Sequence, residues 1–368
     1  MDSIVREVVS RSGVQPRLPE SPTQRAGVDA EDAELERILA SLRTNIKIVG
    51  IGGGGCNTID RLVESGIVGA ELFAANTDAQ HLLIIRSPHK LLLGRRVTRG
   101  LGAGALPQVG EESAREAADE LRSVVQGADM VFITCGLGGG TGTGGAPVLA
   151  QLSKEAGALT IAICTFPFRA EGAIRAENAE YGLEKLRNFA DTVVVIPNDK
   201  LLELVPRLAL NAAFKVADDV LMRAIKGITE IITKPGLVNL DFNDIKTIMK
   251  GGGVAMIGLG ESDRDNRAEE AIEEAINSPL IDVDISAATG ALVNVTGGND
   301  MSVAEAEKVA EIVQGRIAPN ARIIWGAAVD PSLEHKLRVM LILTGVRSKQ
   351  ILGPGEHVRL HGGVDIVR

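Results

Sequence analysis

The chain has 368 residues, a length that favours about two domains. With 45% hydrophobic and 24% charged residues, its composition excludes a disordered chain. The net charge of −9, from 39 basic and 48 acidic residues, argues against a surface that binds nucleic acid or an anionic membrane. No apolar segment is long enough for a membrane helix, and the first residues lack the apolar core of a signal peptide. We therefore expect a cytoplasmic protein with no nucleic-acid partner and no direct membrane insertion.

The three cysteines do not indicate a metal site. Cys56, Cys135 and Cys164 are widely spaced and form no CxxC pair. Because zinc sites and disulfide frameworks need patterned cysteines, we expect small buried thiols and no metal bound by cysteine.

Residues 1–44 form an N-terminal extension in this interpretation. Its first part mixes Pro, Ser, Arg and Glu without periodicity, which is typical of a mobile segment. From Asp32 to Arg43 apolar residues recur at i, i+3, i+4 and i+7, which predicts an amphipathic helix.

Residues 45–210 alternate between strand and helix patterns. The β-branched run IKIVGI is followed by glycines and then by apolar residues at helical spacing, which predicts a strand, a tight turn and a helix. Further strands are expected at 70–75, 130–135, 159–165 and 192–197, and helices at 111–126, 146–156 and 175–189. This order predicts an α/β fold with a Rossmann-like parallel sheet that is covered by helices on both faces.

A long helix with a broad apolar stripe, at 211–233, marks the domain junction, which we place at 211–238. The following region, 239–346, has the pattern of a smaller α/β domain. Its strands are expected at 254–260, 290–298, 321–329 and 337–346, and its helices at 267–276 and after the capping box Ser302-x-x-Glu305. We expect the last two strands to pair directly with each other, and residues 347–368 to form a C-terminal tail.

Three glycine-rich loops follow strand patterns. The first, Gly50 to Gly55, fits GxGxxG, in which backbone N–H groups and a helix N-terminus hold a pyrophosphate. The second, 136–145, has glycine at seven of ten positions, and the third spans 99–104. Each loop alone is also compatible with a tight strand-to-helix turn. Together they favour a triphosphate held mainly by backbone amides, and the lack of GxxxxGK[ST] excludes a P-loop site.

Several further segments are distinctive: NTDAQ at 76–80, TRGLGAG at 98–104, IPNDKL at 196–201, NLDFNDIKTIM at 239–249 and NSPL at 277–280. With GGGTGTG at 138–144, they resemble the tubulin superfamily and, within it, the FtsZ family of prokaryotic cell-division GTPases. Both termini are more similar to archaeal than to bacterial members. The resemblance implies a tubulin/FtsZ-like fold with a GTP-binding domain, a central helix and a C-terminal activation domain.

The resemblance also implies which residues bind the nucleotide, GTP or GDP with Mg²⁺. Asp218 is expected to accept hydrogen bonds from the two adjacent donors of guanine, with Asn57 assisting and Phe214 stacking on the ring. Glu171 and Arg175 match the ribose contacts, although they also form an ordinary i,i+4 helix pair. The nucleotide contacts are Gly52, Gly53, Gly54, Gly55, Asn57, Ala103, Gly104, Gly138, Gly139, Gly140, Thr141, Gly142, Thr143, Gly144, Glu171, Arg175, Asn198, Phe214 and Asp218. We expect no room for a side chain beside the phosphates at Gly140 and Gly142.

The acids Asp241 and Asp244 have two interpretations. By position alone they are a helix N-cap and a first-turn acid. The resemblance implies instead that their loop, with Asn239, enters the next subunit and positions the attacking water beside the γ-phosphate. The implied protein is a GTPase that polymerises head to tail and hydrolyses GTP at each subunit interface.

The implied cellular role is a division ring at mid-cell, with membrane-tethering division proteins as partners. Two alternatives remain open. An NAD-dependent oxidoreductase with a Rossmann domain is favoured by the GxGxxG loop alone. A non-hydrolysing structural member of the same superfamily is the other, and the presence of Asp241 and Asp244 argues against it.

Overall fold

The computed structural model describes residues 44–204, 210–233, 237, 238, 240–278, 280 and 285–346. The helix expected at 32–43, the extension before it, the tail at 347–368 and Asn239 lie outside these residues. Within the described ranges, none of the helices combines the length and the apolar character that a membrane crossing requires.

The described strands form one ten-stranded sheet in the order β3-β2-β1-β4-β5-β6-β7-β10-β8-β9. Its first six strands are parallel: β1 (Ile46–Ile51), β2 (Ala70–Asn76), β3 (His89–Leu92), β4 (Met130–Gly136), β5 (Leu159–Phe166) and β6 (Thr192–Pro197). Because parallel strands point the same way, their carboxyl ends meet at one edge of the sheet, where α/β proteins bind ligands.

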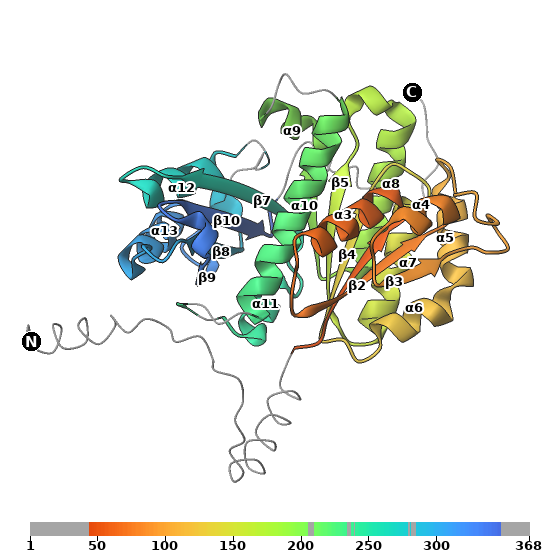
Figure 1. The fold of residues 1–368 in the computed structure, drawn as a ribbon, viewed down its shortest axis with the longest axis horizontal. Helices are drawn as coiled ribbons and strands as arrows, with labels where there is room; N and C mark the ends of the chain where they lie inside the picture. The colour runs from red at the N-terminus through yellow and green to blue at the C-terminus, as the bar shows by residue number, and fades with distance from the viewer. Residues whose placement is uncertain are drawn as a thin grey trace, which may run out of the picture. The chain divides into compact units, whose positions relative to one another are not determined.

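Helices cover both faces of these strands (Figure 1). Side chains alternate along each strand: Ile48 and Phe132 face one core, whereas Val49 and Ile133 face the other. The first core is covered by α3 (Gly52–Glu64), α4 (Ala79–Ile84), α10 (Leu210–Thr233) and α11 (Phe242–Met249). The second is covered by α5 (Pro107–Glu116), α6 (Ala118–Val125), α7 (Thr141–Glu155) and α8 (Ala173–Phe189). The α/β prediction with both faces covered is therefore confirmed.

Some element boundaries differ from the prediction. The helix expected at 111–126 is two helices, α5 and α6, because the backbone at Ala117 leaves the helical region. The helix expected from 146 begins at Thr141, since the glycines of the second loop continue directly into its first turn. The prediction missed β3, α4 and the short α9 (Asn198–Leu204), which are too short for a clear periodicity.

The C-terminal strands are β7 (Gly253–Ser262), β8 (Gly290–Gly297), β9 (Arg322–Val329) and β10 (Leu337–Thr344). The prediction that the last two strands pair with each other is wrong. Strand β9 pairs in parallel with β8, whereas β10 lies between β7 and β8 and is antiparallel to both. The reason is that α13 (Val303–Arg316) joins β8 to β9 as a crossover, which leaves the other side of β8 open for β10.

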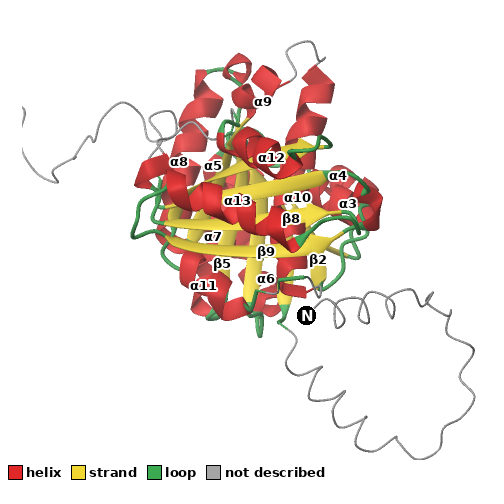
Figure 2. Cartoon of the chain, turned by 90° about the vertical axis from the view of Figure 1, so that its left-hand side faces the viewer, coloured by secondary structure: helices red, strands yellow, loops and turns green. Residues whose placement is uncertain are grey.

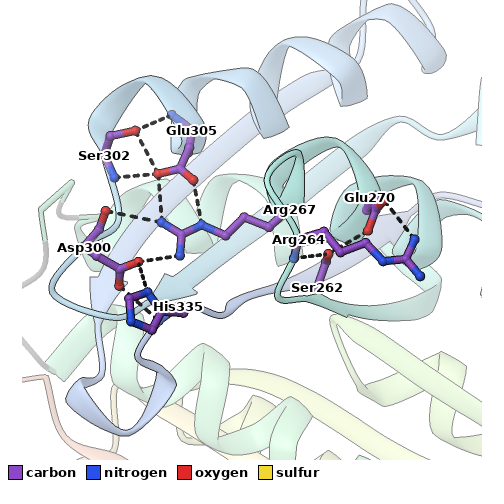
Figure 3. Close-up of polar contacts among 8 residues, drawn as sticks. All are labelled: Ser262, Arg264, Arg267, Glu270, Asp300, Ser302, Glu305 and His335. Carbon is purple, nitrogen blue, oxygen red and sulfur yellow. Dashed lines mark hydrogen bonds and ion pairs between the residues drawn. The ribbon is translucent and has the colours of Figure 1, made fainter.

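A buried arginine ties the helices of this part together. Figure 2 turns α13 and α12 (Arg267–Ile276) toward the viewer. Arg267 is only 8% exposed, and its guanidinium lies 2.7 Å from Glu305 and 2.6 Å from Asp300 (Figure 3). This guanidinium holds the pKa of both carboxyls below their usual range. Glu305 also completes the predicted capping box with Ser302, so one cluster joins the starts of α12 and α13.

Candidate functional site

A cleft of about 410 Å³ lies at the carboxyl ends of the parallel strands. Gly136 ends β4, Thr165 is near the end of β5, and Asn198 directly follows β6. The cleft is lined by Gly53, Gly54, Asn57, Gly104, Gly136, Leu137, Gly139, Gly140, Thr141, Gly142, Thr165, Pro167, Glu171, Arg175, Asn198, Phe214, Ala217 and Asp218. Residues from all three glycine loops and from α10 are therefore brought together.

The first two glycine loops place two helix N-termini side by side. Gly52 has φ +74° and starts α3 directly after β1, a conformation that disfavours any other residue. A Cβ added to Gly52 would lie 2.8 Å from the backbone nitrogen of Gly142, in the first turn of α7. The two helix starts thus form one surface of backbone N–H groups, which is the arrangement that binds phosphate.

The cleft glycines differ in what surrounds them. At Gly53 and Gly139 an added Cβ would meet no protein atom within 4 Å, so a side chain there would project into open space. At Gly140 and Gly142 it would lie 2.6 and 2.7 Å from the backbone oxygens of Gly104 and Gly136. A side chain at Gly140 or Gly142 therefore has no room, as expected, but the neighbouring protein backbone is what excludes it. A substitution at Gly142 would therefore disturb the fold as well as the ligand.

Six of the expected nucleotide contacts do not line the cleft: Gly52, Gly55, Ala103, Gly138, Thr143 and Gly144. Three of them, Gly138, Thr143 and Gly144, shape the loops through contacts within the protein. The Thr143 hydroxyl accepts a hydrogen bond from the Gly138 nitrogen at 2.9 Å, and a Cβ on Gly144 would collide with the carbonyl oxygen of Pro107. Thr77 acts similarly, with its hydroxyl 2.6 Å from that of Thr141. Sequence pattern alone does not separate a glycine that faces a ligand from one that allows close packing.

The α10 side of the cleft carries an acid and a ring. Burial raises the pKa of Asp218 to about 6, and Arg61, whose Nε lies 3.7 Å away, opposes the rise. Phe214 is 37% exposed and contacts Phe168 edge-on, with ring centroids 5.1 Å apart. A carboxylate and an open aromatic face on one wall fit a base with adjacent hydrogen-bond donors.

The remaining polar groups of the cleft include the ion pair of Glu171 with Arg175 and a buried amide. Glu171, in the short turn Arg169–Glu171, accepts hydrogen bonds from Arg175 at 2.8 Å and from the Phe168 nitrogen at 2.9 Å. Asn198 is 4% exposed, and its Oδ1 atom has no hydrogen-bond partner in the described structure. A buried acceptor without a partner inside a cleft indicates a ligand donor at that place.

Asp241 and Asp244 do not line this cleft. Asp241 caps α11 and accepts a hydrogen bond from the Asp244 nitrogen at 2.8 Å, so the N-cap geometry is present. The last residue of α11, Met249, accepts a hydrogen bond from Thr192, at the start of β6. Asn198 follows the end of that strand, about 20 Å away at 3.3 Å per residue. Figures 1 and 2 likewise show α9 and α11 at opposite ends of α10.

Five lining residues were missed: Gly136, Leu137, Thr165, Pro167 and Ala217. Gly136 and Thr165 are register partners on β4 and β5. Thr165 ends the strand predicted at 159–165, and Gly136 directly follows the strand predicted at 130–135, so the ends of the predicted strands point to both, because ligands bind there. Leu137 lies within the second glycine loop, whereas Pro167 and Ala217 belong to no motif, and only packing brings these two to the cleft.

Comparison with known proteins extends these findings. The Tubulin/FtsZ family GTPase domain matches residues 45–206, and the FtsZ family C-terminal domain matches 253–347. The chain is 58% identical to Cell division protein FtsZ 1 of Archaeoglobus fulgidus over 100% of both chains. It is 53% identical to Cell division protein FtsZ 1 of Pyrococcus furiosus, covering 95% of this chain and 94% of that one. An empty FtsZ dimer from M. jannaschii matches with a TM-score of 0.83 and 55% identity, covering 86% of this chain and 92% of that chain.

The oxidoreductase alternative finds no support in these matches. Asn76 stands where a dinucleotide site places its ribose-binding acid, and its Oδ1 atom instead accepts a hydrogen bond from the Thr77 nitrogen at 2.9 Å. The archaeal character expected from the termini agrees with the archaeal relatives. The Archaeoglobus fulgidus relative matches this chain over its full length with more than half of the residues identical, and both family models match as well. The chain therefore belongs to the FtsZ family of cell-division GTPases within the tubulin superfamily.

Proposed function

We propose that the chain binds Mg²⁺-GTP in the cleft and that Asp241 and Asp244 of the next subunit in a head-to-tail filament promote its hydrolysis. The observation that carries this proposal is the separation of these acids from the cleft. Both are exposed and do not line the cleft, and their helix α11 lies at the other end of α10 from α9, whose first residue Asn198 lines the cleft (Figure 1). Acids placed in this way act on a nucleotide only when a second copy docks them, and a head-to-tail contact of this kind repeats into a filament.

The carboxylates within the cleft support this assignment. Glu171 is held by Arg175 and by the backbone, and Asp218 lies on the α10 wall beside Phe214. Neither is free to orient a water at the glycine loops. Hydrolysis of the bond between the β- and γ-phosphates, a phosphoanhydride, needs a group that positions the attacking water, and an exposed carboxylate from another copy supplies one.

The proposed nucleotide pose follows from the two walls of the cleft. The triphosphate lies on the paired N-termini of α3 and α7, and the base lies against α10. Asp218 accepts from the guanine N1–H and amine, Phe214 stacks on the ring, and Arg175 with Glu171 contacts the ribose. The unpartnered Oδ1 of Asn198 accepts a further hydrogen bond from the nucleoside.

Mg²⁺ enters this proposal together with the nucleotide. Within the described residues, no three His, Cys, Asp or Glu side chains are grouped so that they would hold a metal ion. Mg²⁺ in nucleotide sites binds mainly phosphate oxygens and water, so such a group is not required. The hydroxyl of Thr141, in the first turn of α7, is available to the phosphates or to water on the ion.

The cellular part of the proposal rests on family membership. A related chain from M. jannaschii forms a dimer, which supports self-association of this one. We infer a ring at mid-cell whose filaments are held to the membrane by tethering division proteins. A fluorescent fusion should mark the division site, and a diffuse distribution in dividing cells would contradict the inference.

The shared site is tested by mixing two inactive variants. Asp241→Ala retains its own cleft and should bind GTP normally, yet hydrolyse it at least about a hundredfold more slowly because the water activator is lost. Gly139→Val should block the phosphate site and leave the fold intact, because a Cβ at this position meets no protein atom within 4 Å. It still carries Asp241, so in a mixture it activates GTP held by an Asp241→Ala subunit. At equal amounts, about one quarter of the contacts pair the two in the productive order.

Turnover and pelleting are measured together in these mixtures. Asp263→Ala removes an exposed acid of the C-terminal part and serves as the control that keeps its rate. Recovered GTPase activity in proportion to mixed contacts supports the proposal. A normal rate for Asp241→Ala alone, or no recovery in mixtures that co-pellet, would contradict hydrolysis between subunits.

A further inference from the structure

Asn57 lines the cleft from α3, and His81 of α4 contacts its side chain. The Nε2 atom of His81 lies 3.0 Å from the Oδ1 atom of Asn57. The other ring nitrogen, Nδ1, lies 3.1 Å from the Nδ2 atom of Asn76, at the end of β2. The imidazole therefore joins a buried amide of the sheet to an amide of the cleft, across two helices.

The direction of these hydrogen bonds follows from the backbone. Asn76 is 3% exposed, and its Oδ1 accepts from the Thr77 nitrogen at 2.9 Å and the Asp78 nitrogen at 3.4 Å. This leaves its Nδ2 facing the ring, and an amide nitrogen only donates. The Nδ1 of His81 is therefore the acceptor, and the ring proton is on Nε2. Nε2 donates that proton to the Oδ1 atom of Asn57. The hydrogen bonds from the Thr77 and Asp78 backbone to Asn76 thus determine the tautomer of His81 and the orientation of both amides.

The position of His81 is itself constrained. Asp78 caps α4 and accepts a hydrogen bond from the His81 backbone nitrogen at 3.0 Å. The carbonyl oxygen of Asn76 accepts from the Leu93 nitrogen at 2.9 Å, which fixes the other end of the chain of bonds. The ring is thus held at its backbone and at both nitrogens. Such a fully connected network holds one arrangement of its amides.

The consequence concerns the base. With its oxygen engaged by His81, Asn57 has its NH₂ group left to donate to a ligand in the cleft. Guanine offers acceptors, O6 and N7, along the edge beside the N1–H that Asp218 takes, whereas adenine offers an amine in place of O6. We propose that His81 is a positioning residue for guanine specificity, because it fixes Asn57 as a donor toward the O6 and N7 edge. This inference rests on the proposed GTP site.

The test measures nucleotide affinity by competition with a fluorescent GTP, at protein concentrations below those that form filaments. The variants are His81→Ala, His81→Gln and, as a truncation on the same helix, Leu83→Ala, whose side chain is 78% exposed. The nucleotides are GTP, ATP, 7-deaza-GTP, which lacks N7, and 2-aminopurine riboside triphosphate, which lacks O6 and the N1–H; because the second analogue also loses the contact with Asp218, each variant is compared with the wild type on the same nucleotide. Melting temperatures of the nucleotide-free variants are recorded alongside.

His81→Ala should weaken GTP binding by roughly three- to tenfold, the effect of one hydrogen bond whose donor is no longer held in place. The preference for GTP over ATP should fall with it. His81→Gln offers an amide N–H in place of Nε2–H and should restore most of the affinity, and Leu83→Ala should bind as the wild type does. For the analogue that lacks the contacted acceptor, His81→Ala should cause no further loss.

Two results would overturn the inference. An equal loss for GTP and for both analogues would mean that His81 only supports the fold of the cleft, and no loss for GTP would mean that Asn57 does not need it. Both differ from failure of the proposed function. In that case the wild-type protein itself would not prefer GTP to ATP, whatever the variants do.

Discussion

Asp218 should couple GTP binding to the release of a proton. Its side chain is 16% exposed, and burial raises its pKa to about 6 against the opposing effect of Arg61. The guanine N1–H and amine are donors, so they bind the carboxylate and not the protonated acid. Binding therefore favours the ionised form and lowers this pKa. The affinity for GTP should rise with pH across the range in which free Asp218 titrates.

The size of the effect follows from the raised pKa of Asp218. A carboxyl with a pKa of about 6 is ionised in about one tenth of the molecules at pH 5 and in about 99% at pH 8. GTP affinity should thus fall about tenfold from pH 8 to pH 5 through this group alone, and binding near pH 6 should release about half a proton. Asp218→Asn should weaken GTP binding at pH 8 by roughly 1.5–3 kcal/mol, since a charged acceptor is lost.

The raised pKa of Asp218 has the opposite effect on stability: the free energy of unfolding decreases as the pH rises, whereas the affinity for GTP increases. Because folding raises the pKa of Asp218, its stabilising contribution is fully present below pH 4 and is lost as the pH rises through about 6. At pH 8 the buried carboxylate then costs about 3 kcal/mol, a value that already includes the opposing contact with Arg61. Asp218→Asn should therefore raise the free energy of unfolding of the nucleotide-free protein at pH 8 while it weakens GTP binding.

Calorimetry of GTP binding between pH 5 and 8, in buffers with different ionisation enthalpies, measures the released protons. The terminal phosphate of the nucleotide also titrates near pH 6, so the informative quantity is the difference between the wild type and Asp218→Asn. An identical pH dependence for both proteins would refute the reasoning. So would an Asp218→Asn protein that binds GTP normally at pH 8, because the carboxylate would then not touch the base.

Two further predictions concern stability. Gly139→Val should abolish nucleotide binding at an unchanged melting temperature, whereas Gly144→Val should unfold the protein because its Cβ would collide with the backbone of Pro107. Calorimetric melting and nucleotide binding distinguish the two outcomes. A folded Gly144→Val protein would contradict the expected collision. Arg267→Gln leaves its two acid partners uncompensated and should lower the melting temperature by several degrees at pH 7. That difference should shrink below about pH 4, where the acids lose their charge, and a loss independent of pH would assign the effect to packing instead.

Much of the local structure was readable from residue patterns. The strand predicted at 192–197 is β6 with the same boundaries, and the long helix predicted at 211–233 begins one residue earlier. Both predictions rest on the spacing of apolar residues within one segment, and this spacing does not depend on which elements the segment packs against. The glycine loops were found for a similar reason, because a backbone with positive φ at Gly52 and Gly138 tolerates few other residues. The family resemblance supplied the expected base and ribose contacts, which no local pattern indicates.

Other properties depend on segments that are distant in the sequence. The insertion of β10 between β7 and β8 follows from competition among strand pairings, and a single strand pattern does not encode its neighbour. Whether a glycine faces the cleft, as Gly139 does, or a carbonyl oxygen, as Gly144 does, is decided by the helix packed against it. The raised pKa of Asp218 and the contact between His81 and Asn57 likewise arise only where separate helices meet. Burial and hydrogen-bond partners are properties of the packed chain, and for that reason the residue pattern alone does not contain them.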